Sequence, residues 1–192
     1  LTFNPYSKPV EIMSEQNNAH HRKIRSFVLR TGRMTAGQQK AYQDSWQYYG
    51  IEYQLELIDF SEVFGRTAPL VFEIGFGMGQ SLAQMAKDEP DKDFIGVEVH
   101  TPGVGKLMQL IEEEQLSNVR VIEHDAVEIL TDCIPDNALE RVQIYFPDPW
   151  HNTKHHKRRL VQPEFVQLLR KKIKEGGHIH AATDWDHYAE HM

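Results

Sequence analysis

From Pro69 onward, short apolar runs alternate with segments of helical composition, and this alternation limits the folds that the chain can adopt. Such runs, bounded by turn-forming residues, are typical of buried strands. Strands that alternate with helices form βαβ units, whose parallel sheet is covered by helices on both faces. The sequence therefore predicts an α/β fold with a mostly parallel sheet. The expected strands are 70–74, 94–99, 119–122, 139–146 and 178–183, and the expected helices are 36–49, 80–87, 102–115, 126–131 and 163–174.

The length of 192 residues suits one domain with an appendage. We expect residues 1–68 to supply an N-terminal basic segment and one helix, and residues 69–192 to form the α/β domain. The first 19 residues are polar and are expected to form a loose leader. The pair Gly176-Gly177 is expected to end the last helix.

No apolar run approaches the roughly 20 residues of a membrane span, so we expect no membrane contact. The single Cys133 allows neither an internal disulfide nor a cysteine-built metal site. Both features favour a cytoplasmic protein, which could be a monomer or a homodimer.

Charge is segregated along the chain, although the net charge is -7. Residues 151–174 hold eight Lys or Arg against one acid, and residues 20–40 hold six with no acid. Two basic clusters on an acidic body are the usual electrostatic footprint of nucleic-acid binding. A solvated surface helix is the alternative explanation, and it is preferred for residues 170–174.

Four carboxylates follow or end four successive predicted strands: Glu73, Glu98, Asp125 and Asp148. Ligands of open parallel sheets bind beyond the carboxyl ends of the strands, near the point where the strand order reverses. These side chains are therefore expected to form one ligand site.

A glycine-rich turn with Gly75, Gly77 and Gly79 follows the first strand. It lacks both the G-x-G-x-x-G spacing of a dinucleotide site and the Lys-Ser/Thr of a P-loop. The carboxylate of Glu73 would repel pyrophosphate and attract a cation such as S-adenosylmethionine, unless it only caps the following helix dipole. Glu98 could then accept both hydroxyls of the cofactor's ribose.

Several motifs stand in a fixed order along the chain. They are Glu73-Ile-Gly-Phe-Gly-Met-Gly79, Ile95-Gly-Val-Glu98, His124-Asp-Ala126, Phe146-Pro-Asp-Pro-Trp150 with its basic sequel, and Thr183-Asp-Trp185. Together they resemble the bacterial tRNA (guanine-N7-)-methyltransferases, which methylate the variable-loop guanine at position 46. The resemblance covers most of residues 25–190 and implies a Rossmann-like class I methyltransferase that uses S-adenosylmethionine and tRNA.

The resemblance also implies a role for each matching residue. Glu73, Glu98 and Asp125 would hold the cofactor's methionine portion, ribose and adenine. The glycines of the turn would lie beside the cofactor, and Asp148 would contact it at the transfer site. The implied substrate-binding residues are Asn152, Lys154, His155, His156, Lys157, Arg158, Arg159 and Asp184.

One position and the C-terminal end of the chain depart from the family pattern. Asn152 stands where the family usually has Lys. The family continues with further strands and a Thr-x-Phe-Glu motif, whereas this chain ends at Met192. The C-terminal strands are therefore expected to lie beyond it.

Other functions compete with this interpretation. A cofactor- and RNA-binding module without activity is one, although the four strand-end carboxylates favour an enzyme. An amino-methyltransferase would have Asn/Asp-Pro-Pro-Tyr/Phe in place of Asp148-Pro-Trp150. His151, His155 and His156 could ligate zinc if they were helical, but no Cys accompanies them and the neighbouring cations oppose a dication. A polar RNA-binding loop without metal is preferred.

Overall fold

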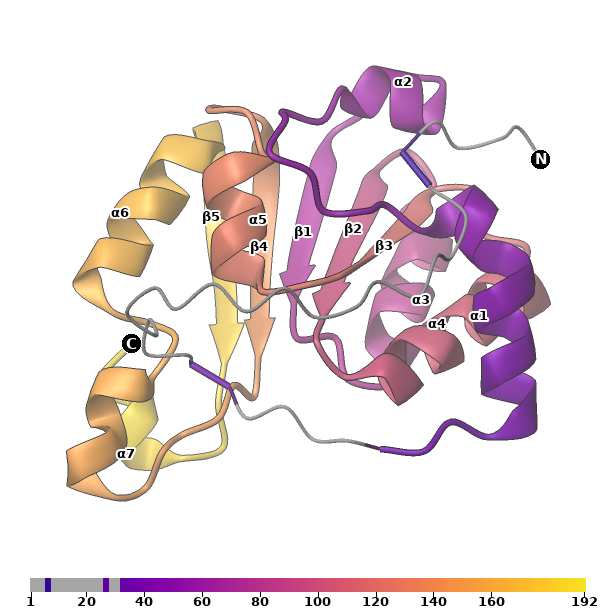
Figure 1. Ribbon diagram of the computed structural model, residues 1–192. Coiled ribbons are helices and arrows are strands. Elements are labelled where there is room, and N and C mark those ends of the chain that lie inside the picture. The colour runs from indigo at the N-terminus through magenta and orange to yellow at the C-terminus, as the bar shows by residue number, and fades with distance from the viewer. Residues whose placement is uncertain (1–5, 8–25, 28–31) are drawn as a thin grey trace.

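A five-stranded parallel sheet forms the centre of the computed structural model, which describes residues 6–7, 26–27 and 32–192 (Figure 1). The strands are β1 (Leu70–Ile74), β2 (Asp93–Glu98), β3 (Val119–Glu123), β4 (Leu139–Tyr145) and β5 (Ile173–Ala182). Their order in the sheet is β3-β2-β1-β4-β5, and every neighbouring pair is parallel. The predicted fold class is confirmed.

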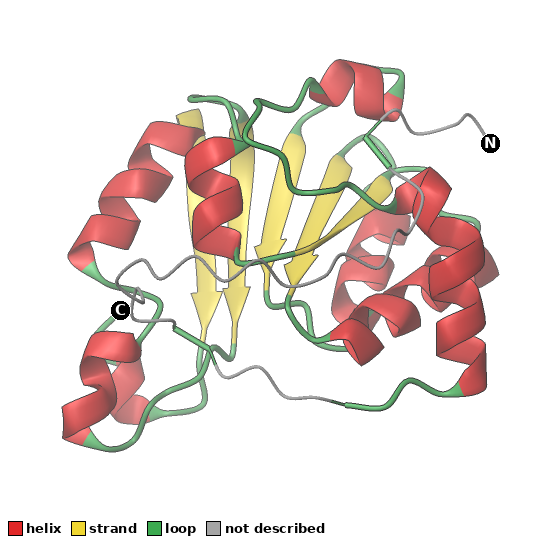
Figure 2. Ribbon diagram, viewed as in Figure 1, coloured by secondary structure: helices red, strands yellow, loops and turns green. Residues whose placement is uncertain are grey.

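Helices cover both faces of the sheet (Figure 2). They are α1 (Ala36–Tyr49), α2 (Phe60–Phe64), α3 (Gln80–Asp88), α4 (Thr101–Glu113), α5 (Ala126–Asp132), α6 (Pro163–Lys172), α7 (Asp186–Ala189) and the 3-10 helix η1 (Thr153–Arg158). One apolar core lies between the sheet and α1, α3 and α4, and includes Val71 and Leu107. The other lies between the sheet and α2, α5 and α6, and includes Phe72 and Phe165. The sheet is therefore buried from both sides, as the apolar runs predict.

Local sequence signals set the ends of several elements. Thr35 begins α1 with a capping box, in which its hydroxyl accepts from the Gln38 amide and the Gln38 side chain accepts from the Thr35 amide. Pro102 and Pro163 occupy the first turns of α4 and α6, where a helix needs no backbone donor. The bounds of α1 and β1 are those predicted, and those of β2, β3, β4, α3 and α5 differ by at most one residue at each end.

The prediction for the end of α6 is wrong. The helix ends at Lys172, and the pair Gly176-Gly177 lies inside β5. The ammonium of Lys172 is buried and donates to a backbone carbonyl and to Asp136, which holds the end of the helix. Gly176 has φ 79° and lies where the register between β4 and β5 shifts. The pair thus shapes an irregular strand instead of capping a helix.

Three short elements were not predicted. Helix α2 has five residues, and Asp59 caps it by accepting from two backbone amides. Helix α7 has four residues. Residues 153–158 form η1 where a polar loop was expected, and Asn152 caps it. Elements of one turn are too short to show a helical period.

Much of the first basic cluster lies outside the described residues, since only Arg33 and Lys40 of its six cations are described. Lys40 pairs with Asp44 one turn along α1. The predicted leader also lies outside the described residues, apart from residues 6–7. Within the described ranges, none of the helices has the length and apolar character needed to cross a bilayer.

Candidate functional site

A cleft of about 310 Å³ opens at the carboxyl ends of the strands. The strand order reverses between β1 and β4, and the cleft lies at this point, which is where parallel α/β sheets bind ligands. Gly75, Glu98, Asp125 and Asp148 line it. The structure therefore brings together three of the four carboxylates expected to form one site.

The glycine-rich turn forms one wall of the cleft. Gly75, Gly77 and Gly79 have φ of 71°, 59° and 77°, a region that favours glycine. A Cβ built on Gly103, at the start of α4, would lie 2.1 Å from the carbonyl oxygen of Gly77. The turn therefore packs directly against the backbone of α4, and only Gly75 among its three glycines lines the cleft.

Glu98 ties this turn to the end of β2. One carboxylate oxygen accepts from the Gly77 amide at 2.9 Å, and the other accepts from the amides of Val99 and His100 at 2.7 and 3.0 Å. A carboxylate offers about four acceptor positions, and three are occupied by backbone donors. Glu98 thus has room for one ligand hydroxyl, and it could accept both ribose hydroxyls only if one amide moved away.

Asp125 is held at the end of β3 by its role as the N-cap of α5. Its Oδ1 accepts from the Val127 amide at 2.9 Å. The neighbouring His124 also lines the cleft, with Nε2 2.7 Å from the Glu128 carboxylate. The His124 ring stacks on Tyr53, with centroids 4.0 Å apart and planes at 9°. A flat aromatic pair therefore borders the cleft beside Asp125.

Asp148 lies in the loop that follows β4. Phe146 and Trp150, on either side of it, have φ of 49° and 46°, which is strained for residues other than glycine. The Trp150 indole donates to the Ser26 carbonyl at 3.0 Å, and Ser26 and Phe27 also line the cleft. The strained loop and the described part of the N-terminal segment thus enclose the cleft together.

Glu73 does not line the cleft. Its side chain is 2% exposed, it lies in register with Gln143 of β4, and its Oε2 has no hydrogen-bond partner among the described residues. Burial raises the pKa of Glu73 to about 7, outweighing the opposite effect of Arg141. Tyr145 lines the cleft, and burial, then the charge of Glu73, raise the pKa of its hydroxyl.

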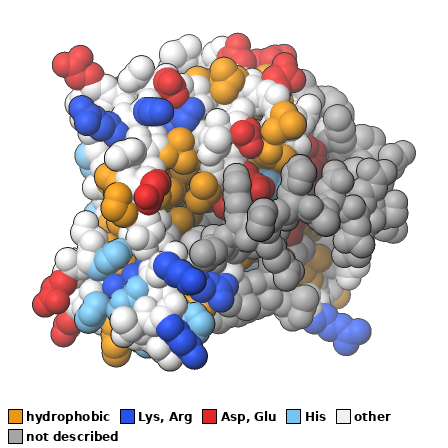
Figure 3. Space-filling model, turned by 60° about the vertical axis from the view of Figure 1, so that its left-hand side comes forward, with side chains coloured by type: hydrophobic (Ala, Val, Ile, Leu, Met, Phe, Trp, Pro, Cys, Tyr) orange, Lys and Arg blue, Asp and Glu red, His pale blue; other side chains and the backbone are white. Residues whose placement is uncertain are grey.

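We call residues 152–159 the basic segment; it follows the Asp148 loop. In the face of the molecule that Figure 3 shows, His, Lys and Arg side chains gather at the lower end. Lys154 and Lys157 are exposed, as phosphate-binding residues must be. The Arg158 guanidinium lies 3.8 Å from the centroid of the Trp150 ring. Asn152, the departure from the family pattern, accepts from the Lys154 amide at 3.4 Å and so caps η1.

The structure does not place Arg159 with the exposed cations. Its side chain is 2% exposed, and its Nε donates to the Pro149 carbonyl at 2.9 Å. Arg159 therefore points into the protein and does not present its guanidinium to an RNA phosphate in this conformation.

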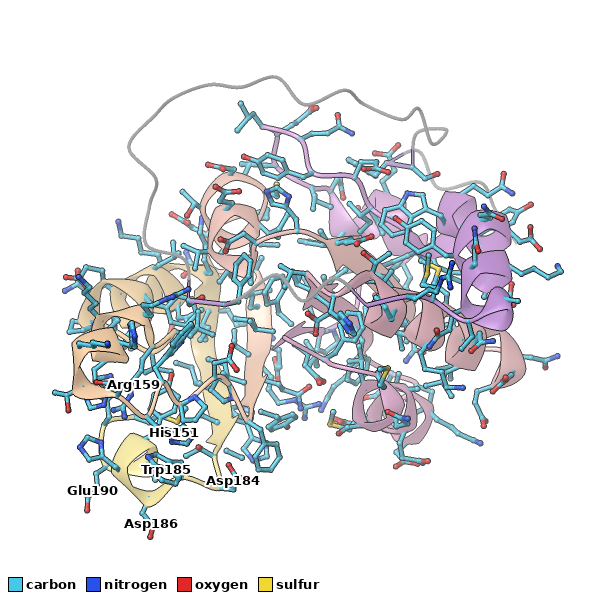
Figure 4. All side chains as sticks on the ribbon, turned by 60° about the horizontal axis from the view of Figure 1, so that its bottom comes forward. His151, Arg159, Asp184, Trp185, Asp186 and Glu190 are labelled. Atoms are coloured by element: carbon cyan, nitrogen blue, oxygen red, sulfur yellow. The ribbon has the colours of Figure 1, made fainter. Side chains whose placement is uncertain are left out.

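The remaining predicted substrate residues lie near η1 and the end of β5. His155 and His156 are half-buried, and the His155 ring lies 5.9 Å from that of Trp150. Asp184 is exposed just beyond β5 (Figure 4). The adjacent Trp185 ring contacts His151, with centroids 4.3 Å apart. In the part of the chain that the structure describes, no group of three or more His, Cys, Asp or Glu is arranged to hold a metal ion.

Two features at the cleft were not predicted. Tyr53, which stacks on the cleft residue His124, lies in a segment without regular periodicity, and the cleft residues 26–27 lie far from the others in sequence. Neither carries a local signal. His124 did carry one, because it stands beside a strand-end carboxylate.

Comparison with known proteins identifies close relatives. The family described as "Putative methyltransferase" matches residues 67–192. A tRNA (guanine-N(7)-)-methyltransferase of Pseudoalteromonas atlantica is 59% identical over 92% of this chain and 74% of that protein. The protein of the same name from Alcanivorax borkumensis is 61% identical over 89% of this chain and 72% of that protein.

Solved structures support the fold alone. The 16S rRNA methyltransferase KamB superposes with a TM-score of 0.53 at 12% identity, covering 71% of this chain and 63% of that one. An antibiotic-related methyltransferase superposes with a TM-score of 0.50 at 17% identity, covering 69% of this chain and 68% of that one. Both likenesses agree with a Rossmann-like α/β sheet.

Proposed function

Because the chain belongs to the tRNA (guanine-N(7)-)-methyltransferase family, we propose that it transfers a methyl group from S-adenosylmethionine to N7 of the variable-loop guanine of tRNA. One observation carries this proposal. The cleft at the carboxyl edge of the sheet holds Glu98, Asp125 and Asp148, and the Asp148 loop leads along the chain into the basic segment with its exposed Lys154 and Lys157.

The cofactor fits the cleft by its chemistry. The ribose would donate to the remaining acceptor position of Glu98, and the adenine would lie beside Asp125 and the His124–Tyr53 stack. The turn at Gly75 lets the methionine portion approach the backbone closely. Glu73 is buried in the strand before this turn. It would act on the cationic cofactor without direct contact, through the negative charge that it carries above its pKa of about 7.

The transfer needs no general base, because N7 of guanine carries an exposed lone pair. The lone pair attacks the sulfonium methyl, the carbon–sulfur bond breaks, and positive charge passes from sulfur to the purine. The protein must then supply alignment and a matching field. Asp148 supplies a negative charge at the cleft, and Asp184, just beyond β5, is proposed to contact the guanine.

Loss of the Glu98 carboxylate is expected to weaken cofactor binding. Glu98→Ala removes a charge-assisted acceptor for the ribose and releases the Gly77 amide. The binding free energy of S-adenosylmethionine should therefore become less favourable by about 2–3 kcal/mol. Isothermal titration calorimetry measures this change. Glu123→Ala is the matched control, because Glu123 ends β3 next to Glu98 but bonds Tyr42 and Thr101 outside the cleft. Equal affinities of Glu98→Ala and the wild type would remove Glu98 from the site.

The exposed cations are expected to contribute salt-dependent tRNA affinity. Replacing Lys154 and Lys157 with Ala should reduce the slope of log affinity against log salt by up to about two, since each phosphate contact releases roughly one counterion. Cofactor affinity should not change. Arg170→Ala combined with Lys171→Ala removes the same charge from the exposed surface of α6 and is the control. If both double variants changed the salt slope equally, Lys154 and Lys157 would contribute no more to tRNA binding than the cations of α6.

A direct product analysis tests the proposed function. Purified protein is incubated with a tRNA transcript and S-adenosylmethionine carrying a labelled methyl group, and the nucleosides are then separated by mass spectrometry. We expect labelled 7-methylguanosine from the variable loop and none from a transcript with adenosine at that position. Label on another nucleoside, or none at all, would refute the proposal.

A further inference from the structure

Arg159 is a buried cation that has no ion-pair partner among the residues that the structure describes. It is 2% exposed, and it forms no ion pair with any described carboxylate. Its Nη1 has no hydrogen-bond partner among the described residues either. Taking a guanidinium out of water without a counter-charge is unfavourable. A surface cation for phosphate binding would not be placed in this way.

The remaining nitrogens of Arg159 join three segments of the chain. Nε donates to the Pro149 carbonyl, while Nη2 lies 3.2 Å from His156 Nε2 and 3.3 Å from His187 Nδ1. The guanidinium also lies 4.8 Å from the centroid of the Tyr188 ring. Arg159 thus connects the loop after β4, η1 and α7. Figure 4 shows it at the same end of the sheet as His151 and Trp185.

The bond to Pro149 links Arg159 to the proposed transfer site. Pro149 directly follows Asp148, and its carbonyl accepts from a charged donor, which makes a stronger bond than a neutral donor does. The pKa of Tyr188 is raised by burial, lowered by Arg159 and raised by Asp148, so both charges lie near this ring. The position of the guanidinium therefore constrains the loop that carries Asp148.

The two histidines can accept from Arg159 only while they are neutral. A guanidinium has donors only, so His156 Nε2 and His187 Nδ1 must both lack a proton. Burial, then Arg159 and His187, lower the pKa of His156. A backbone hydrogen bond with His151 opposes this effect, and His191, just after α7, adds to it. The hydrogen bond from Arg159 to His156 is fully formed above the ordinary histidine pKa of about 6.5. It is lost as pH falls through the lower pKa of folded His156.

We propose that Arg159 is a positioning residue that orients the Asp148 loop, and that its contact with the neutral side chain of His156 makes this orientation dependent on pH. The inference rests on the proposed function, because Asp148 is taken to act at the transfer site. It replaces direct phosphate binding as the role of Arg159.

Kinetics separate positioning from RNA binding. Arg159→Lys keeps the charge but loses the planar fork that reaches three acceptors. Its kcat should fall roughly 10- to 100-fold because Asp148 is misplaced, while KM for tRNA and the salt slope stay close to the wild-type values. A rise in KM and a smaller salt slope with unchanged kcat would show a phosphate contact and overturn the proposal.

The pH profile gives a readout that a purely structural role would not move. Wild-type kcat should decrease as pH falls below about 6.5. His156→Gln places a non-titrating acceptor next to Arg159 and should remove most of this decrease. His178→Gln, on the exposed part of β5, is the matched control. An identical profile for wild type and His156→Gln would contradict the role of His156.

Histidine NMR tests the same contact without turnover. In the wild type His156 should titrate below about 6.5, and in Arg159→Gln its pKa should move upward because a neighbouring cation is lost. Circular dichroism shows whether the variant folds, and the wild-type titration is informative if it does not. An ordinary pKa in the wild type overturns the proposal. The predicted titration in a protein that makes no 7-methylguanosine would instead refute the proposed function and leave the Arg159 contact standing.

Discussion

Replacing Asp148 with asparagine is expected to lower kcat by about 100- to 1000-fold, the usual effect of removing one preorganised electrostatic group from an active site. The substitution keeps the shape of the side chain and removes its negative charge. Positive charge moves from the cofactor sulfur to the guanine during transfer, so a carboxylate at the cleft stabilises the transition state more than an amide does. Single-turnover kinetics with saturating tRNA and S-adenosylmethionine measure the change.

The Asp148 variant should bind tRNA nearly as well as the wild type, because the cations of the basic segment are unchanged. Asp186→Asn is the matched control, since Asp186 is an exposed carboxylate at the start of α7 that does not line the cleft. Its kcat should stay near the wild-type value. Near-normal turnover in Asp148→Asn would show that the charge of Asp148 has no part in the transfer.

Glu73→Gln is expected to stabilise the protein at alkaline pH. The buried carboxyl has its pKa raised from 4.5 to about 7, so the folded state holds a proton that the unfolded state releases between these values. The contribution of Glu73 to the free energy of unfolding is therefore fully present below pH 4.5, and it is lost as pH rises through about 7. A shift of this size corresponds to about 3 kcal/mol at pH 9, and the Gln variant should regain most of it.

Urea unfolding at several pH values measures this effect. The variant and the wild type should have similar free energies of unfolding near pH 4.5 and should diverge as pH rises. Glu89→Gln is a control of opposite sign, because hydrogen bonds from Arg141, then Lys92, lower the pKa of Glu89 to about 2. That variant should be less stable than the wild type at neutral pH. A pH-independent difference for Glu73→Gln would mean that Glu73 is ionised in the folded protein.

Much of the fold could be read from local patterns. The alternation of strands and helices predicted the sheet, and helical composition that ends before Gly50 predicted the bounds of α1. The end of α6 could not be read in this way. Its position depends on Lys172, whose ammonium bonds a carbonyl and a carboxylate from a loop more than 30 residues earlier.

The sequence by itself determined the parallel sheet, the carboxyl edge as the ligand site and the side chains available there, because strand periodicity and strand-end carboxylates are local properties. Only the tertiary structure decided which of those side chains the cleft can use. It buried Glu73 in the sheet and outside the cleft, where desolvation raises the pKa of its carboxyl group. It left Glu98 with one acceptor position, because three backbone amides occupy the others. It also turned Arg159 inward while Lys157 stayed exposed, although both belong to one basic run. Burial depends on contacts between residues far apart in the chain, and a run of like residues carries no record of which ones those contacts will cover.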